Sequence, residues 1–147
     1  MTVTIRGLQQ GEAAILNAVK KASKQVMIDN MTDLERVASE TAPLDEGDLE
    51  MGGSHSVVVS GDKFIGQVRF QAWNNNPNRS YDFNYAIKMH EDNYNLGKKS
   101  QQKAGGSGNS GKSYPVGRKY LTRPLQGEAP YYRKQIKQAV KDALKDA

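Results

Sequence analysis

An eight-residue hinge at residues 42–49, with the sequence Ala-Pro-Leu-Asp-Glu-Gly-Asp-Leu, constrains the fold more than any other stretch of the chain. Because Pro43 disfavours helical geometry at Ala42, a helix arriving from the N-terminal side must end there. Gly47 can adopt the positive φ that a sharp reversal often requires. Leu49 is the first apolar residue after this turn, and we expect it to enter the core as the chain passes into a sheet. The hinge therefore predicts a helical N-terminal part followed by a strand-rich middle.

Length and composition restrict the class of protein. The chain has 147 residues, no cysteine and a formal net charge of +5. A chain of this length buries roughly 70% of its unfolded surface, so we predict a single domain over residues 1–147. The lack of cysteine excludes disulfides and thiolate metal sites, and it is consistent with a reducing cytosol. No apolar run approaches the roughly 20 residues that cross a bilayer, and the N-terminus lacks a signal-peptide pattern. We therefore expect a soluble protein without a membrane partner.

Two stretches have the periodicity of amphipathic helices. Over residues 9–41, apolar residues recur at steps of three and four, which predicts one long helix, bent near Asn30 in one alternative. In the other alternative, Thr32 caps a second helix. After Pro130, apolar residues recur at four-residue steps, which predicts a C-terminal helix with this proline at an early position.

The middle of the chain has the composition of strands. β-Branched and aromatic residues on both sides of a glycine-containing turn predict a hairpin formed by His55–Val59 and Phe64–Phe70. Thr2–Arg6 is expected to be a short edge strand or an ordered arm. The strict alternation of apolar residues from Tyr81 to Met89 favours a half-buried strand, whereas a short helix also groups apolar residues there. Both interpretations of this segment stay open.

These elements predict an α+β fold, in which a long N-terminal helix and a C-terminal helix pack on a small antiparallel sheet of three to four strands. Residues 95–113 contain mainly lysine, glutamine, glycine, serine and asparagine, which predicts a long flexible loop within the domain. Its four positive charges make it a candidate contact for a partner or for DNA. These charges are Lys98, Lys99, Lys103 and Lys112.

The motifs that suggest catalysis or cofactor binding lack the required context. Residues 106–113, Gly-Ser-Gly-Asn-Ser-Gly-Lys-Ser, match the phosphate-loop pattern, but that pattern works only between a buried strand and a helix start. Pro115 follows too soon for such a helix. His90 precedes two acids, yet Tyr94 stands where a zinc protease has its second histidine. We predict no catalytic, cofactor-binding or metal-binding residue and therefore no enzyme.

Three stretches resemble, in order, motifs of the phage head-tail joining family, which comprises neck and tail-completion proteins often labelled minor capsid proteins. Residues 42–49 resemble its Ala-Pro-x-Asp-Thr-Gly-x-Leu signature. Residues 85–91 are similar to its Tyr-Ala-x-x-x-His/Val-Glu segment, and residues 119–125 to its Lys-aromatic-Leu-x-x-Pro/Ala-Leu segment. Glu46 replaces the usual threonine, and the lysine-containing loop resembles an insertion. The matching residues are Pro43, Asp45, Gly47, Leu49, Tyr85, Ala86, His90, Glu91, Tyr120, Leu121 and Pro124.

The resemblance implies a structural virion protein of the phage neck, which forms a ring that joins the DNA-filled head to the tail. The implied partners are copies of the chain, in a hexamer or alternatively a dodecamer, the head-closure and portal-side proteins, and the tail-terminator or tail-tube proteins. The implied location is the head-tail interface of the virion, reached from the host cytoplasm during assembly. The lysine-containing loop would then contact either a protein partner or, non-specifically, genomic DNA in the lumen.

Two other functions compete with the neck protein. A tail-terminator ring differs from it only in its position in the particle. A small basic nucleic-acid-binding module, from a different class, is favoured by a pI near 9.4 and by the tyrosines. The excess of 21 basic over 16 acidic residues is modest, however, and it supports solubility at least as well.

Overall fold

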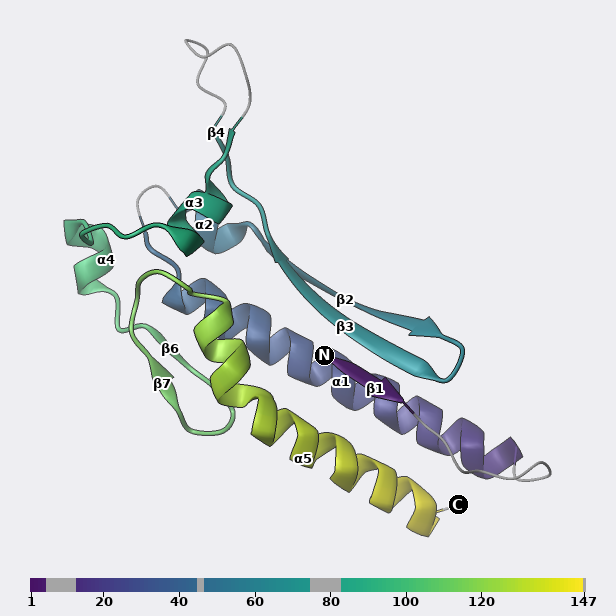
Figure 1. Ribbon diagram of the computed structural model, residues 1–147. Coiled ribbons are helices and arrows are strands. Elements are labelled where there is room, and N and C mark those ends of the chain that lie inside the picture. The colour runs from purple at the N-terminus through teal and green to yellow at the C-terminus, as the bar shows by residue number, and fades with distance from the viewer. Residues whose placement is uncertain (5–12, 45–46, 75–82, 147) are drawn as a thin grey trace. The chain divides into compact units, whose positions relative to one another are not determined.

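Two long helices and a small antiparallel sheet dominate the computed structural model, which describes residues 1–4, 13–44, 47–74 and 83–146 (Figure 1). The elements in chain order are β1 (Thr2–Thr4), α1 (Ala13–Thr41), α2 (Asp48–Met51), β2 (Gly53–Ser60), β3 (Lys63–Phe70), β4 (Trp73–Asn74), β5 (Phe83–Asn84), α3 (Tyr85–Glu91), α4 (Lys98–Gln102), β6 (Gly106–Ser107), β7 (Ser113–Tyr114) and α5 (Thr122–Asp146). This is the predicted α+β fold. In the described part of the chain, no helix is both long and apolar enough to span a bilayer.

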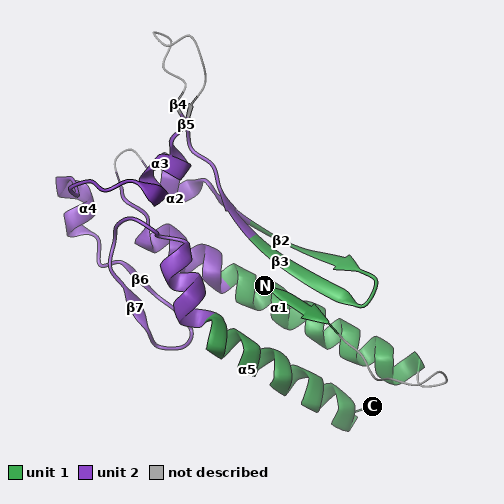
Figure 2. Cartoon of the chain, viewed as in Figure 1, with its two compact units in different colours: residues 1–32, 55–67, 129–147 green, residues 33–54, 68–128 purple. Residues whose placement is uncertain are grey.

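The chain divides into two compact units, each built from separate segments (Figure 2). Unit 1 comprises residues 1–32, 55–67 and 129–147, and unit 2 comprises residues 33–54 and 68–128. Both long helices and the hairpin contribute residues to both units. The single domain expected from chain length stays a prediction.

In the sheet of unit 1, Gly66 of β3 contacts both the N-terminal residue and helix α1. Its strand order is β1-β3-β2, and Val3 of β1 lies opposite Phe64 of β3 in an antiparallel pair. Gly66 donates its N–H to the Met1 carbonyl at 2.8 Å and accepts from the Met1 amino group at 3.0 Å. A Cβ at Gly66 would lie 2.8 Å from the Met31 side chain, so β3 and α1 are in close contact there.

The helices of unit 1 pack through the faces that their periodicity predicts. Asn30 on α1 donates from Nδ2 to the Tyr132 carbonyl oxygen on α5 at 3.3 Å, so the helices lie side by side at this point (Figure 2). The alternative with a second helix is wrong, because the Thr32 hydroxyl donates to the Ile28 carbonyl of its own helix at 2.8 Å. The buried apolar residues of unit 1 are Val19, Met27, Met31, Phe64, Tyr132 and Ile136.

The predicted hairpin is confirmed, with β2 and β3 joined by a two-residue turn at Gly61–Asp62. Gly61 has a φ of 59°, which a glycine adopts without steric strain. The predicted N-terminal strand is confirmed as β1, whereas Ile5 and Arg6 lie outside the described residues.

The segment that the sequence leaves open between strand and helix contains both. β5 pairs antiparallel with β4 through Trp73 and Asn84, and α3 follows at once. Asn84 determines this change, because its Oδ1 accepts the N–H of Ala86 at 3.2 Å and so caps the helix. Tyr81 lies outside the described residues.

Residues 95–113, for which the sequence predicts a long flexible loop, contain the short elements α4, β6 and the start of β7, while the flexibility of the segment stays a prediction. Two of its glycines pack closely through their backbone. A Cβ at Gly106 would lie 2.5 Å from the Val37 carbonyl oxygen, and a Cβ at Gly108 would overlap the Glu128 carboxylate. A composition with only one large apolar side chain, Leu96, therefore does not exclude close packing here.

The predicted start of the C-terminal helix at Pro130 is also wrong, because α5 begins at Thr122 and continues through Pro130. Pro124 occupies the first turn, where the missing N–H removes no helical hydrogen bond, and it is fully buried.

We expect Gly108→Ala to lower the free energy of unfolding by about 3 kcal/mol, because the added methyl group would overlap a buried carboxylate. Gly97→Ala is the matched control, since a Cβ at Gly97 meets no atom within 4 Å, and we expect it to change stability by less than about 1 kcal/mol. Urea denaturation followed by circular dichroism measures both. Equal stabilities of the two variants would contradict the packing of this segment.

Candidate functional site

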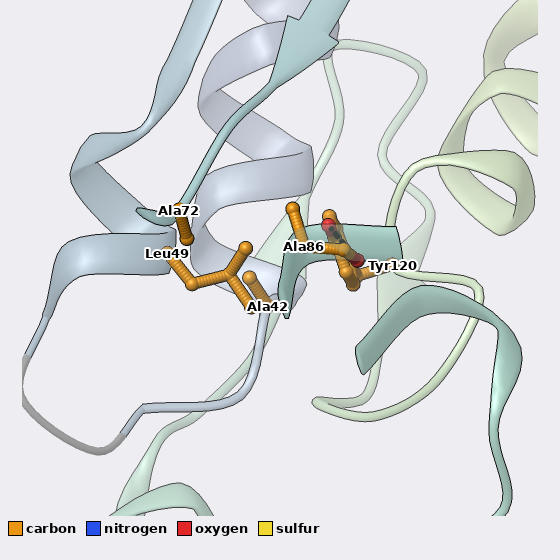
Figure 3. Packing of buried hydrophobic residues seen from close by; sticks show 5 residues of the cluster. All are labelled: Ala42, Leu49, Ala72, Ala86 and Tyr120. Atoms are coloured by element: carbon orange, nitrogen blue, oxygen red, sulfur yellow. Dashed lines mark hydrogen bonds between the residues drawn. The ribbon is translucent and has the colours of Figure 1, made fainter. Parts of the chain in front are cut away.

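The three motif stretches, which are far apart in the sequence, supply side chains to one buried cluster in unit 2 (Figure 3). We call it the motif cluster, and it consists of Ala42, Leu49, Ala72, Ala86 and Tyr120. Ala42 and Leu49 come from the first stretch, Ala86 from the second and Tyr120 from the third. The fold therefore brings all three stretches together around common apolar contacts.

The hinge has the geometry that its sequence predicts, with one difference. Gly47 has a φ of 93°, which confirms the predicted reversal. Leu49 is 4% exposed, which confirms its burial, but it lies in the short helix α2 and not at the start of a strand. Pro43 follows the last turn of α1, while Asp45 and Glu46 lie outside the described residues.

The C-terminal end of α1 is completed by a lysine that the sequence assigns to a flexible loop. Lys103 donates from Nζ to the Ala42 carbonyl at 2.8 Å and to the Ser39 carbonyl at 3.2 Å. It also lies 3.4 Å from the Glu50 carboxylate. The last carbonyls of a helix lack intrahelical partners and carry partial negative charge, so a cation stabilises them. Lys103 therefore has a structural contact, and its side chain is only 12% exposed.

The other predicted contact lysines differ in their surroundings. Lys112 donates from Nζ to the Gly127 carbonyl at 3.0 Å, so it too is engaged within unit 2. Lys98 and Lys99 are exposed on α4. That helix is fastened to the hinge by Ser100, whose hydroxyl accepts the N–H of Leu44 at 2.9 Å.

Tyr120 joins the second and third stretches through its hydroxyl and its ring. The hydroxyl donates to the Ala86 carbonyl at 2.9 Å, and the side chain is 1% exposed. The ring makes edge contacts with Phe70 and His90, with centroid separations of 5.3 and 5.1 Å. Burial raises the pKa of the Tyr120 hydroxyl above its usual range, so it stays protonated and remains a donor.

His90, at the end of α3, caps the start of α5. Its Nδ1 lies 2.7 Å from Glu91 Oε1, and its Nε2 lies 3.3 Å from the N–H of Thr122 and 3.1 Å from the Thr122 hydroxyl. In the tautomer with the proton on Nδ1, Nε2 accepts from Thr122 and satisfies an amide at the N-terminus of α5. In return, Lys119 donates its N–H to the His90 carbonyl at 2.8 Å, and Arg118 donates to the Glu91 carbonyl at 3.0 Å. The two helix ends are therefore capped by each other's chain segments.

The hydroxyl, imidazole and carboxylate at this junction have the order found in a nucleophile–base–acid triad. The imidazole Nε2, however, also faces the backbone amide of Thr122, and the Glu91 carboxylate pairs with the Lys119 ammonium group. The first contact is that of a helix cap, and the second is a salt bridge between side chains. Among the described residues, no group of three or more acidic or histidine side chains is arranged to hold a metal ion.

At this junction, the Glu91 carboxylate contacts both the Lys119 ammonium group and the His90 ring. Its contact with Lys119, and to a smaller extent its contact with His90, lowers the pKa of Glu91 below its ordinary value of 4.5. Above pH 4.5, the ionised Glu91 carboxylate therefore stabilises the folded state. This stabilisation is lost as the pH falls through the lowered pKa.

Two hollows open beside the motif cluster, both within unit 2. One, of about 280 Å³, is lined by Pro43, Leu49, Tyr85, Met89, Tyr94 and Leu96, among others. The other, of about 360 Å³, is lined by residues that include Phe70, Ile87, His90, Tyr120 and Thr122. Residues of the three stretches thus also form the walls of these hollows. Their mainly apolar linings favour contacts with apolar groups over polar chemistry.

Two buried carboxylates hold the β6–β7 hairpin, and nothing in the sequence pattern indicates this role. Glu128, fully buried, accepts from the Ser110 amide at 3.1 Å and from the Tyr114 hydroxyl at 2.9 Å. Asp33 accepts from the Asn109 amide at 3.3 Å. These amides belong to the stretch that matches the phosphate-loop pattern. Because carboxylates of the same chain occupy them, they do not form an open phosphate site.

Comparisons with known proteins found no match to this chain among family models, curated proteins or solved structures. A functional assignment therefore depends on the motif resemblance and on the geometry described above.

We expect Lys103→Met to lower the free energy of unfolding by about 2 kcal/mol, because it removes a charged donor from two carbonyls at the end of α1. Lys98→Met removes the same charge from an exposed position, and we expect a change within about 0.5 kcal/mol. Thermal and urea denaturation measure the difference. Equal effects would show that Lys103 does not complete the helix.

We also expect the Glu91 carboxyl to titrate below 4.5, and Lys119→Gln to move its pKa upward by removing the largest cause of the shift. Lys98→Gln, which has the same charge change elsewhere in unit 2, should leave the titration of Glu91 unchanged. Carbon-13 NMR of the side-chain carboxyl groups measures both. A Glu91 pKa that is insensitive to Lys119 would contradict the described junction.

Proposed function

We propose that this chain is a structural virion protein of the phage neck, forming a ring that joins the DNA-filled head to the tail. The motif cluster is the observation that carries the proposal. Each of the three stretches that resemble the head-tail joining family contributes to this cluster. Unrelated sequence coincidences have no reason to meet at one place in the fold.

The placement of the three stretches relative to the elements also supports the proposal. Residues 42–49 directly follow the long helix α1 and precede the β2–β3 hairpin. Residues 119–125 lead into the terminal helix α5. This order of helix, hinge, hairpin and terminal helix is the one that the family resemblance implies.

Exposed apolar side chains in unit 2 are suited to contacts between subunits. Met51 is 78% exposed, Ile87 is 67% exposed and Trp73 is 50% exposed. A closed ring of identical subunits uses two different faces of each subunit, and aromatic residues and methionine are enriched in such interfaces. We propose that these residues contact neighbouring copies, in a hexamer or a dodecamer, or the adjoining head-closure and tail proteins.

The proposed contact between residues 95–113 and DNA has less support than the contacts between subunits. Lys103 and Lys112 donate to carbonyl groups of the same unit, so their ammonium groups are already engaged. Lys98 and Lys99 stay as candidate contacts with a protein partner or with DNA in the lumen because their side chains are exposed on α4.

The test is to delete the gene for this chain from the phage that encodes it and to examine the lysate by negative-stain electron microscopy. We expect DNA-filled heads without tails, together with free tails of normal length, and rescue by the wild-type chain. Free tails of uncontrolled length would instead assign the chain to the tail terminator. Infectious tailed particles without this chain would contradict both assignments.

A point variant tests the proposed interface. We expect Trp73→Ser to reduce tail attachment at least tenfold without changing the unfolding temperature of the monomer, because the side chain is half exposed. Leu144→Ser removes a similarly exposed apolar side chain from unit 1 and serves as the control. Normal attachment with Trp73→Ser would exclude this residue from the interface.

A further inference from the structure

The excess positive charge of the chain belongs entirely to unit 1. The residues of unit 1 include ten lysines and arginines against five acids, whereas those of unit 2 include eleven of each. The net charge of +5 is therefore the net charge of unit 1, whereas unit 2 is formally neutral. Five of the ten basic residues of unit 1 lie on α5.

Four lysines form a stripe on α5, opposite its buried face. Since successive residues of a helix are about 100° apart, the four lie within about 80° of its circumference and extend over about 16 Å. The buried residues Tyr132 and Ile136 lie on the other side of the helix. All four lysines are exposed, and no salt bridge to them is present among the described residues. The lysine stripe consists of Lys134, Lys137, Lys141 and Lys145.

Two exposed lysines of α1 lie at the same level but do not extend the stripe. Within unit 1 the two helices run in opposite directions, with Asn30 in contact with Tyr132 (Figure 1). Counting along both helices from this contact at about 1.5 Å per residue, Lys24 is level with Gln138 and Lys21 with Lys141. At about 100° per residue, however, they lie about 120° and about 180° around α1 from Asn30, whose side chain faces α5, so they point away from the stripe. Lys21 and Lys24 are both exposed.

We propose that the lysine stripe forms a sequence-independent binding surface for the phosphate backbone of duplex nucleic acid. The stripe consists of lysines, which act as point charges toward phosphates and lack the bidentate fork that arginine uses to read guanine. This surface is distinct from residues 95–113, whose lysines belong to the neutral unit.

Other partners fit this surface less well. A helix that lies in a membrane inserts its apolar face into the lipid, but Tyr132 and Ile136 place that face of α5 in the core of unit 1. A stable protein interface has apolar or aromatic anchors at its centre, whereas this stripe consists of charged residues. On unit 2 of a second copy, Asp48 of the hinge and the adjacent Glu50 are acidic, but Glu50 is already paired with Lys103.

The inference is independent of the proposed neck function, because duplex binding requires no ring. The test measures fluorescence anisotropy of a labelled 30-base-pair duplex of arbitrary sequence, with the purified full chain, between 20 and 200 mM KCl. We expect dissociation constants in the range of about 1 to 100 µM, weakening steeply with salt. Lys137→Gln with Lys141→Gln should reduce the slope of log affinity against log salt by about 2.

The matched control is Lys88→Gln with Lys98→Gln, which removes two exposed charges from unit 2 and should leave the slope unchanged. No binding at 20 mM KCl, or equal loss in the two double variants, would overturn the inference. Phosphatidylserine vesicles and sedimentation velocity test the other partners. Binding to vesicles without binding to duplex, or an oligomer that dissociates only in the stripe variant, would assign the surface to lipid or to a second copy.

Discussion

Unit 2 depends on how the ends of its helices are satisfied. A helix end leaves backbone donors or acceptors without partners, and burying them unpaired is costly. Lys103 completes the end of α1, Asn84 completes the start of α3, and His90 completes the start of α5. Each of these side chains comes from outside the helix that it caps or from its boundary. The same bonds that finish the helices therefore also place them around the motif cluster.

Buried carboxylates extend this arrangement to the β6–β7 hairpin. Glu128 and Asp33 lie on the two long helices and accept backbone amides of the hairpin. Gly108 allows this approach because it has no side chain between its backbone and Glu128. A segment of mainly small polar residues is therefore packed by hydrogen bonds and by the close backbone approach that glycine allows. It packs without an apolar core of its own.

The two units differ in the kinds of interaction that they can make with partners. Unit 2 is formally neutral and exposes Trp73 and Ile87, so apolar contacts are the interactions it can offer to other subunits. Unit 1 carries the excess positive charge on exposed helix faces, so its long-range interactions favour a polyanion.

Local sequence determined the elements whose signal lies within a few residues. The periodicity of α1, the turn at Gly61 and the positive φ of Gly47 follow from side-chain spacing and steric limits, and all were predictable. Burial of Leu49 was predictable for the same reason, although its helical conformation was not. The three motif stretches were visible in the sequence, but their meeting in one cluster was not.

Tertiary structure decided those conformations that depend on contacts between residues distant in the sequence. Tyr81–Met89 fits two periodicities, and the cap provided by Asn84 selects the helix in the described part of this segment. Residues 95–113 have only one large apolar side chain, Leu96, so their packing depends on Glu128, Asp33 and the end of α1, which no local pattern contains. The start of α5 at Thr122 likewise depends on His90, 32 positions away. Spacing along the chain determines which conformations are sterically favoured, whereas hydrogen bonds between distant residues determine which of them is stable.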